Sequence, residues 1–172
     1  MTTPASVSIV ALRGMPLVSR GDDLAHLITN AAAAQGELLG DGTVVIVAQK
    51  IVSKAEGRMV RLAEVTPSAR ATELAAATHK DPRFVQVVLD ESKEVLRSGR
   101  DVLIVESRQG FICANAGVDR SNAGSDDDQV LLLPHDADAS AAALRAGLRQ
   151  LTGADVAVII SDTHGRAFRM GA

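Results

Sequence analysis

The sequence predicts a mixed α/β or α+β domain in which mixed sheets are flanked by helices. Short apolar runs of strand length interleave with segments of helical periodicity, without the strict alternation of a doubly wound sheet. The 172 residues are of single-domain size, and 47% apolar against 23% charged residues are ordinary globular proportions. We therefore expect one folded domain over residues 1–172.

The first half of the chain predicts two strands separated by a helix. Residues 7–12 form an apolar run that ends in a turn signal at residues 13–16. A helix with Asp22 as its N-cap is expected next, because apolar residues then recur at helical spacing. This buried stripe consists of Leu24, Leu27, Ile28, Ala31 and Ala32. Asp41-Gly42 marks a turn before a buried strand over residues 43–48.

The middle of the chain predicts two short helices and two short strands. Thr66-Pro67 and Asp81-Pro82 each fit an N-cap followed by a proline at the first helical position. Strands are expected over residues 102–106 and 130–133, with a stretch rich in Gly, Asn and Asp over residues 110–129 between them.

The last two predicted elements are a helix and a strand. Asp138 or a neighbouring residue caps the helix, which ends at Gly153. Leu144, Leu148 and Leu151 are expected on its buried face. The final strand covers residues 156–160.

Composition and charge exclude several classes of function. Aromatic residues make up 2% of the chain, with three Phe and no Trp or Tyr, so the core must be aliphatic. The chain also has too few aromatic side chains for a surface on which nucleic-acid bases stack. A net charge of −3 without a long basic run argues against a nucleic-acid partner. No apolar run approaches the roughly 20 residues of a membrane span, and residues 1–5 carry no signal-peptide pattern. We expect a cytoplasmic protein with no membrane partner, and a buried, unreactive Cys113.

The common nucleotide and catalytic motifs are absent from the sequence. It contains no P-loop, no G-x-G-x-x-G, no H-E-x-x-H, no C-x-x-C and no G-x-S-x-G. Any nucleotide site must therefore use another scaffold.

Three polar clusters remain as candidate sites. The first covers residues 49–58, where three cations follow a strand and could hold phosphates, although a solvated turn fits the same pattern. The second covers residues 110–122, where small residues surround Asp119, and a self-capping loop is the alternative. The third follows the last strand with Asp162 and Thr163 as hard-cation ligands and Arg166 and Arg169 as an anion clamp. A capping Asp-Thr pair with surface arginines is the alternative there.

These clusters resemble the motifs of the coenzyme F420-0:L-glutamate ligase (F420 γ-glutamyl ligase) family. The resemblance rests on Val52–Arg58, Ala114–Asn122 and Ser161–Arg169, in the same order along the chain. It implies the family's mixed α/β fold and a homodimer. It also implies a GTP-dependent ligase that phosphorylates the phospholactyl carboxylate of F420-0, joins L-glutamate to it as an amide, and adds further γ-linked glutamates.

The resemblance also implies site residues and cofactors. Asp119, Asp162 and Thr163 correspond to ligands of Mg²⁺ or Mn²⁺, and K⁺ is a further possible ion. The positions implied to contact GTP are Gly14, Met15, Pro16, Leu17, Gln49, Lys50, Lys54 and Asn122. To these we add Arg166 and Arg169 as catalytic phosphate clamps.

The sequence departs from the family pattern in two ways. Phe168 stands where the family has Trp, and family members continue beyond the position of Ala172 with a further metal- and nucleotide-binding segment. Two other functions therefore stay open at this stage. One is a non-catalytic remnant that acts as a folded or dimerising module, and the other is an amide ligase for a different carboxylate acceptor.

Overall fold

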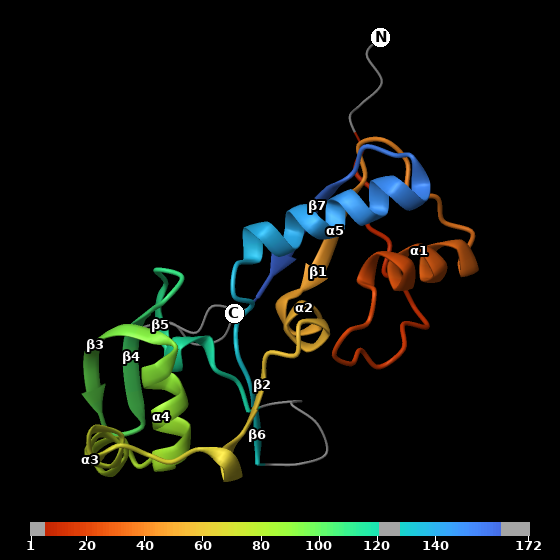
Figure 1. Cartoon of the computed structure of the whole chain (residues 1–172). Coiled ribbons are helices and arrows are strands. Elements are labelled where there is room, and N and C mark those ends of the chain that lie inside the picture. The colour runs from red at the N-terminus through yellow and green to blue at the C-terminus, as the bar shows by residue number, and fades with distance from the viewer. Residues whose placement is uncertain (1–5, 121–127, 163–172) are drawn as a thin grey trace.

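The computed structural model describes residues 6–120 and 128–162 (Figure 1). It confirms a mixed fold of helices and small sheets. In chain order the elements are α1 (Leu24–Ala34), β1 (Val44–Ala48), α2 (Gln49–Ala55), β2 (Met59–Arg61), the 3₁₀ turn η1 (Leu62–Glu64), α3 (Ala69–Thr78), α4 (Pro82–Asp90), β3 (Ser92–Gly99), β4 (Val102–Ser107), β5 (Ile112–Ala114), the 3₁₀ turn η2 (Asn115–Gly117), β6 (Gln129–Leu131), α5 (Ala137–Thr152) and β7 (Ala157–Ser161).

The strands form three separate sheets of different kinds. β1 and β7 pair in parallel, β2 and β6 pair antiparallel, and β3, β4 and β5 form an antiparallel sheet. Figure 1 shows β3–β5 with α3 and α4 at one end of the molecule and β1, β7, α1, α2 and α5 at the other. The β2–β6 pair lies between these two groups.

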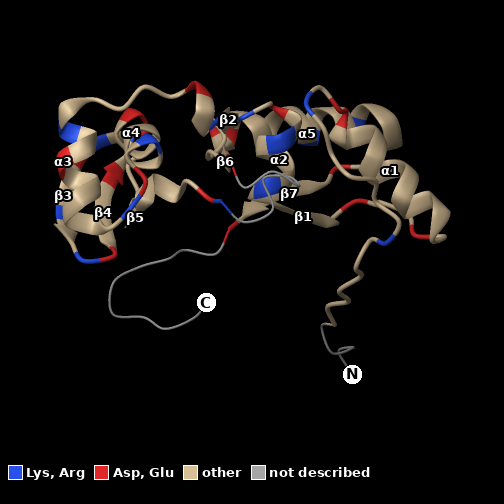
Figure 2. Cartoon of the chain, turned by 90° about the horizontal axis from the view of Figure 1, so that it is seen from below, with Lys and Arg blue, Asp and Glu red and all other residues tan. Residues whose placement is uncertain are grey.

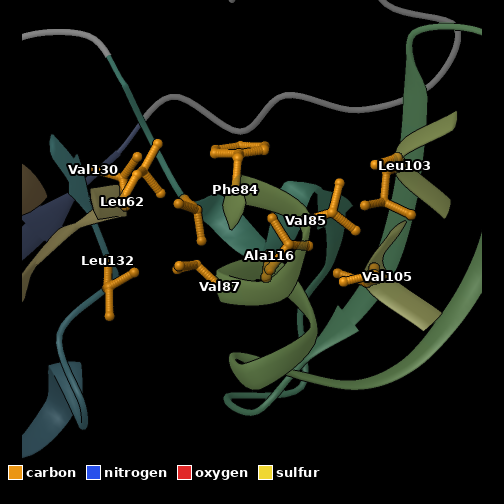
Figure 3. Packing of buried hydrophobic residues seen from close by; sticks show 13 residues of the cluster. Leu62, Phe84, Val85, Val87, Leu103, Val105, Ala116, Val130 and Leu132 are labelled. Atoms are coloured by element: carbon orange, nitrogen blue, oxygen red, sulfur yellow. The ribbon is translucent and has the colours of Figure 1, made fainter. Parts of the chain in front are cut away.

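The first hydrophobic cluster packs α4 between the β2–β6 pair and the three-stranded sheet (Figure 3). Leu62 and Val130 lie on one side of α4 and Leu103 and Val105 on the other. Its members are aliphatic apart from Phe84, as the composition predicts. This cluster fixes the segment after β5, which carries one of the candidate site residues.

The second cluster packs α1 and α5 against the β1–β7 pair. Ile28 from α1, Val45 and Val47 from β1, and Leu144 and Leu148 from α5 are buried in it. Leu151 was expected on the same buried face, but its side chain is 39% exposed. It lies in the last turn of α5, close to the end of the helix at Gly153.

Several predicted boundaries are confirmed and others are wrong. Asp81 caps α4 with Pro82 in its first turn, and α5 begins after Asp136 and ends at Gly153, which has a left-handed conformation. Asp23 caps α1 in place of Asp22, and Ser68 caps α3 in place of Thr66. In both cases the side chain that bonds the first helical turn lies one or two residues later in the chain than predicted.

The predicted first strand is wrong, and one α-helix and three strands were missed, besides the two 3₁₀ turns. Residues 7–12 pair with no strand among the described residues, and Val7 is 91% and Ile9 93% exposed, so their hydrophobicity alone did not produce a strand. The missed helix and strands are α2, β2, β3 and β5. β3 alternates poorly between apolar and polar residues and contains two irregularities in its register, and the stretch that holds β5 was expected as a loop.

Gly117 occupies a position that other residues fit poorly. Its φ is +71°, and a Cβ atom there would lie 2.8 Å from side-chain carbons of Leu133. We expect Gly117→Ala to lower the free energy of unfolding by about 2 kcal/mol, through left-handed strain and a steric clash. Gly36→Ala is the matched control, because Gly36 has φ +74° with open space around it. Urea unfolding should show the larger loss for Gly117→Ala, and equal losses would contradict the steric argument.

Candidate functional site

The carboxyl ends of β1 and β7 bring the first predicted cluster close to Asp162 of the third. The two strands run parallel, with Ala48 opposite Ser161. Gln49 and Lys50 follow β1 directly, and Asp162 follows β7 directly. The carboxyl ends of neighbouring parallel strands are where α/β proteins place ligand sites. The cationic cluster and Asp162 therefore share one edge of the sheet.

The residues after β1 form a helix, and not the turn that was the alternative. α2 places Lys50 and Lys54 one helical turn apart, so their side chains leave the same face. Figure 2 shows basic segments of α2 next to β7. Gln49 is buried, and its carboxamide nitrogen donates to Ser53 Oγ at 2.5 Å and to the carbonyl oxygen of Leu132 at 3.2 Å. Gln49 thus ties the start of α2 to the chain after β6.

Asp119 joins this edge from the second predicted cluster. Its carboxylate pairs with Lys50 Nζ at 2.5 Å, and the two side chains are 34% and 30% exposed. Its backbone is fixed by reciprocal hydrogen bonds with Leu131, at 2.9 and 2.8 Å. An ion pair that is about one-third exposed, on a fixed backbone, can exchange partners with a charged ligand at little cost in conformational entropy.

Arg58 was counted as the third cation of the first cluster, but it has a structural role. Its guanidinium donates to Glu91 at 2.8 Å and to the carbonyl oxygen of Leu133 at 2.9 Å. The side chain therefore connects the start of β2 with the end of α4 and with the chain after β6. The cations of this cluster that remain as candidates for phosphate binding are Lys50 and Lys54.

Cys113 lies in β5 and is buried, as the sequence predicts. Burial raises the pKa of its thiol above the ordinary value, and the negative charge of Asp162 acts in the same direction.

The raised pKa predicts slow alkylation of Cys113. At pH 8 a thiol with a raised pKa is less ionised than a free cysteine, and the thiolate is the reactive form. We expect iodoacetamide to react with the folded protein at least about tenfold more slowly than with the protein in concentrated urea. Mass spectrometry of the time course measures this, and equal rates would show an exposed thiolate.

The remaining predicted residues are placed as follows. Gly14 has φ +72° and Leu17 is 93% exposed, whereas Met15 packs against the second hydrophobic cluster. The predicted residues that lie outside the described residues are Asn122, Thr163, Arg166 and Arg169. Within residues 6–120 and 128–162, no group of three or more His, Cys, Asp or Glu side chains is placed to hold a metal ion.

A cavity of about 350 Å³ opens beside Asp119. Lys80 and Asp81 line it from the α3–α4 connection, and Asn115 and Arg120 line it from the segments on either side of Asp119. The side chain of Arg83 donates hydrogen bonds to Asp81 and lowers the pKa of that carboxyl. Lys80 and Asn115 were not among the site residues predicted from the sequence. Asn115 could have been considered, because it lies inside the second cluster.

The sequence comparisons identify the family. The family model described as F420-0:Gamma-glutamyl ligase matches residues 14–172. The chain belongs to this family. It is 48% identical to the coenzyme F420:L-glutamate ligase of Methanothermobacter thermautotrophicus, over 96% of this chain. It is 50% identical to the ligase of the same name from Methanopyrus kandleri over 90% of this chain, and 46% identical to that of Archaeoglobus fulgidus over 96%.

This member of the F420-0:gamma-glutamyl ligase family spans 58–65% of the length of those three relatives. All three of the clusters found in the sequence fall within the matched residues. None of the described helices combines the length and the hydropathy that a bilayer crossing requires.

Proposed function

We propose that the protein containing this chain is a GTP-dependent ligase that joins L-glutamate to the phospholactyl carboxylate of coenzyme F420-0 and then adds further γ-linked glutamates. The observation that supports this most directly is the Lys50–Asp119 ion pair beside the carboxyl ends of β1 and β7, in a chain of this family. The relatives that carry the name coenzyme F420:L-glutamate ligase supply the substrates of the proposal.

The proposed reaction proceeds through an acyl phosphate. A carboxylate oxygen of the acceptor attacks the γ-phosphorus of GTP, the bond to the β–γ bridging oxygen breaks, and GDP leaves. The neutral α-amine of glutamate then attacks the activated carbonyl carbon, the bond to the phosphate oxygen breaks, and inorganic phosphate leaves with the proton of the amine. In the proposal Lys50 and Lys54 pair with the phosphates, and the fact that both side chains leave one face of α2 supports this.

The donor set fits a hard divalent cation. Asp119 and Asp162 supply carboxylate oxygens near one sheet edge, and Mg²⁺ typically takes one or two carboxylates together with substrate phosphate oxygens. In the proposal Asp119, Asp162 and Thr163 hold Mg²⁺ or Mn²⁺. A bound cation would offset negative charge on the transferring phosphoryl group. K⁺ as a further ion belongs to the same proposal.

The other assignments are also proposals. Gly14–Leu17, Gln49, Lys50, Lys54 and Asn122 contact GTP, and Arg166 and Arg169 clamp the phosphates as catalytic residues. Hydrogen bonds to Ser53 Oγ and to the carbonyl oxygen of Leu132 fix the carboxamide of Gln49 for that contact. We further propose a homodimer in the cytoplasm.

An assay with the full-length natural protein tests the function. The protein is incubated with GTP, Mg²⁺ or Mn²⁺, L-glutamate and F420-0, and the products are separated by chromatography. We expect glutamylated F420 and one GDP for each amide formed. Absence of product under all metal conditions would overturn the proposal. Product with another carboxylate acceptor, but none with F420-0, would identify a ligase of different specificity.

A further inference from the structure

The cavity beside Asp119 has the size of a site for a small polar ligand. Its volume of about 350 Å³ lies at the lower end of the roughly 300–1,000 Å³ range of small-molecule sites. It is therefore better matched to an amino acid than to a deazaflavin. Its wall includes Asp119, so a ligand in it would lie next to the ion pair with Lys50.

Asn115 lines this cavity and carries an acceptor that has no hydrogen-bond partner among the described residues. Its Oδ1 atom is buried and accepts no hydrogen bond from any of the described residues. An unsatisfied buried acceptor costs about 1–3 kcal/mol. Asn115, Ala116 and Gly117 also have consecutive positive φ values of 53°, 56° and 71°, which fix the backbone in an uncommon conformation. A non-glycine residue in this conformation, such as Ala116, is uncommon, and such residues cluster at active sites and ligand-binding segments. A ligand N–H group would satisfy Asn115 Oδ1.

Lys80 provides the cavity with a positive charge. It follows the left-handed residue that ends α3, lines the cavity, and forms no ion pair with any of the described residues. Arg120 adds a second cation, which is held over the Phe84 ring at 4.7 Å and lies 3.7 Å from Asp81. The guanidinium of Arg120 is thus partly compensated, whereas the ammonium of Lys80 is available to an anionic ligand.

We propose that this cavity is the subsite for the acidic amino acid that acts as nucleophile, and this proposal rests on the proposed ligase function. Asn115 Oδ1 accepts a hydrogen bond from its α-amino group, and Lys80 pairs with one of its carboxylates. The amine is thereby held beside Asp119, next to the edge where phosphoryl transfer is proposed. Lys80 and Asn115 are binding and positioning residues for this substrate.

Steady-state kinetics of the full-length protein test the subsite with Lys80→Met and Asn115→Leu. Lys80→Met removes the charge and keeps the length of the side chain, and Asn115→Leu removes the acceptor at similar size. We expect each variant to raise the KM for L-glutamate by about tenfold or more, with the KM for GTP changed less than twofold. Lys93→Met is the matched control, because Lys93 lies on β3 and pairs with Glu106 away from the cavity. It should leave both KM values unchanged.

The possible outcomes separate the subsite from the function. If the unaltered protein forms no glutamylated product, the proposed function itself fails. If it is active but both variants keep the KM for glutamate within twofold, the subsite is overturned and the function stands. A rise in the KM for GTP alone would assign the cavity to the nucleotide and would also overturn the proposed amino-acid subsite. Circular dichroism melting checks folding, and Lys80→Met still decides the matter if Asn115→Leu unfolds.

Discussion

Asp119→Asn is expected to lower the rate of the proposed ligase reaction in the full-length protein by about 100-fold or more. Asp119 is the proposed metal ligand that also pairs with Lys50 at 2.5 Å. The amide removes one negative charge from the proposed metal site and leaves Lys50 without this partner. Charge stabilisation by a bound metal is worth several kcal/mol in phosphoryl transfer, and each 1.36 kcal/mol corresponds to a tenfold change in rate.

The measurement is the initial rate of amide formation at several Mn²⁺ concentrations. We expect the variant to need a higher Mn²⁺ concentration for half-maximal rate, which a purely structural role of Asp119 would not produce. Glu94→Gln is the control, because Glu94 is an exposed carboxylate on β3 in the three-stranded sheet. A full rate for Asp119→Asn, with an unchanged Mn²⁺ requirement, would remove Asp119 from the site.

The second large effect is expected in the core that supports the site. Leu148 on α5 is fully buried in the cluster around β1 and β7. Leu148→Ala removes three side-chain carbon atoms from the core and leaves a cavity. In comparable buried sites this change lowers the free energy of unfolding by about 2–5 kcal/mol. We expect a loss of about 3 kcal/mol in the free energy of unfolding, measured by urea titration followed by circular dichroism.

Leu151→Ala provides the comparison on the same helix. Leu151 is 39% exposed, so its removal should cost less than about 1 kcal/mol. Because the chemical change is identical in both variants, helix propensity cancels between them. Equal losses would mean that α5 packs on the sheet through a different face from the one described.

The sequence was informative where local chemistry decides the structure. β1, β4 and the caps of α4 and α5 followed from apolar runs and from short-range signals such as Asp81-Pro82 and Gly153. It failed where tertiary contacts decide. Residues 7–12 were predicted as a strand but pair with no strand in the described part of the chain, and β3 is a strand mainly because β4 pairs with it.

The candidate site shows the same division. The residue types of the three clusters indicated phosphate and metal chemistry, and the family is confirmed by the comparisons. The pairing of Lys50 with Asp119 joins residues far apart in the chain, so no spacing could predict it. Arg58 looked equivalent to Lys50 in the sequence, but its partner Glu91 comes from α4. Asn115 became a candidate only through the burial of its oxygen.

The parallel pairing of β1 with β7 has a consequence for biosynthesis. The two strands are more than a hundred residues apart in the chain, whereas β3, β4 and β5 follow one another closely. During translation the three-stranded sheet can therefore form while β1 still lacks its hydrogen-bonding partner. Val45 and Val47 on β1 lack their partner strand until β7 has left the ribosome. Closing that pair is expected to be the slow, late step in folding, and it is also the step that creates the edge shared by Lys50 and Asp162.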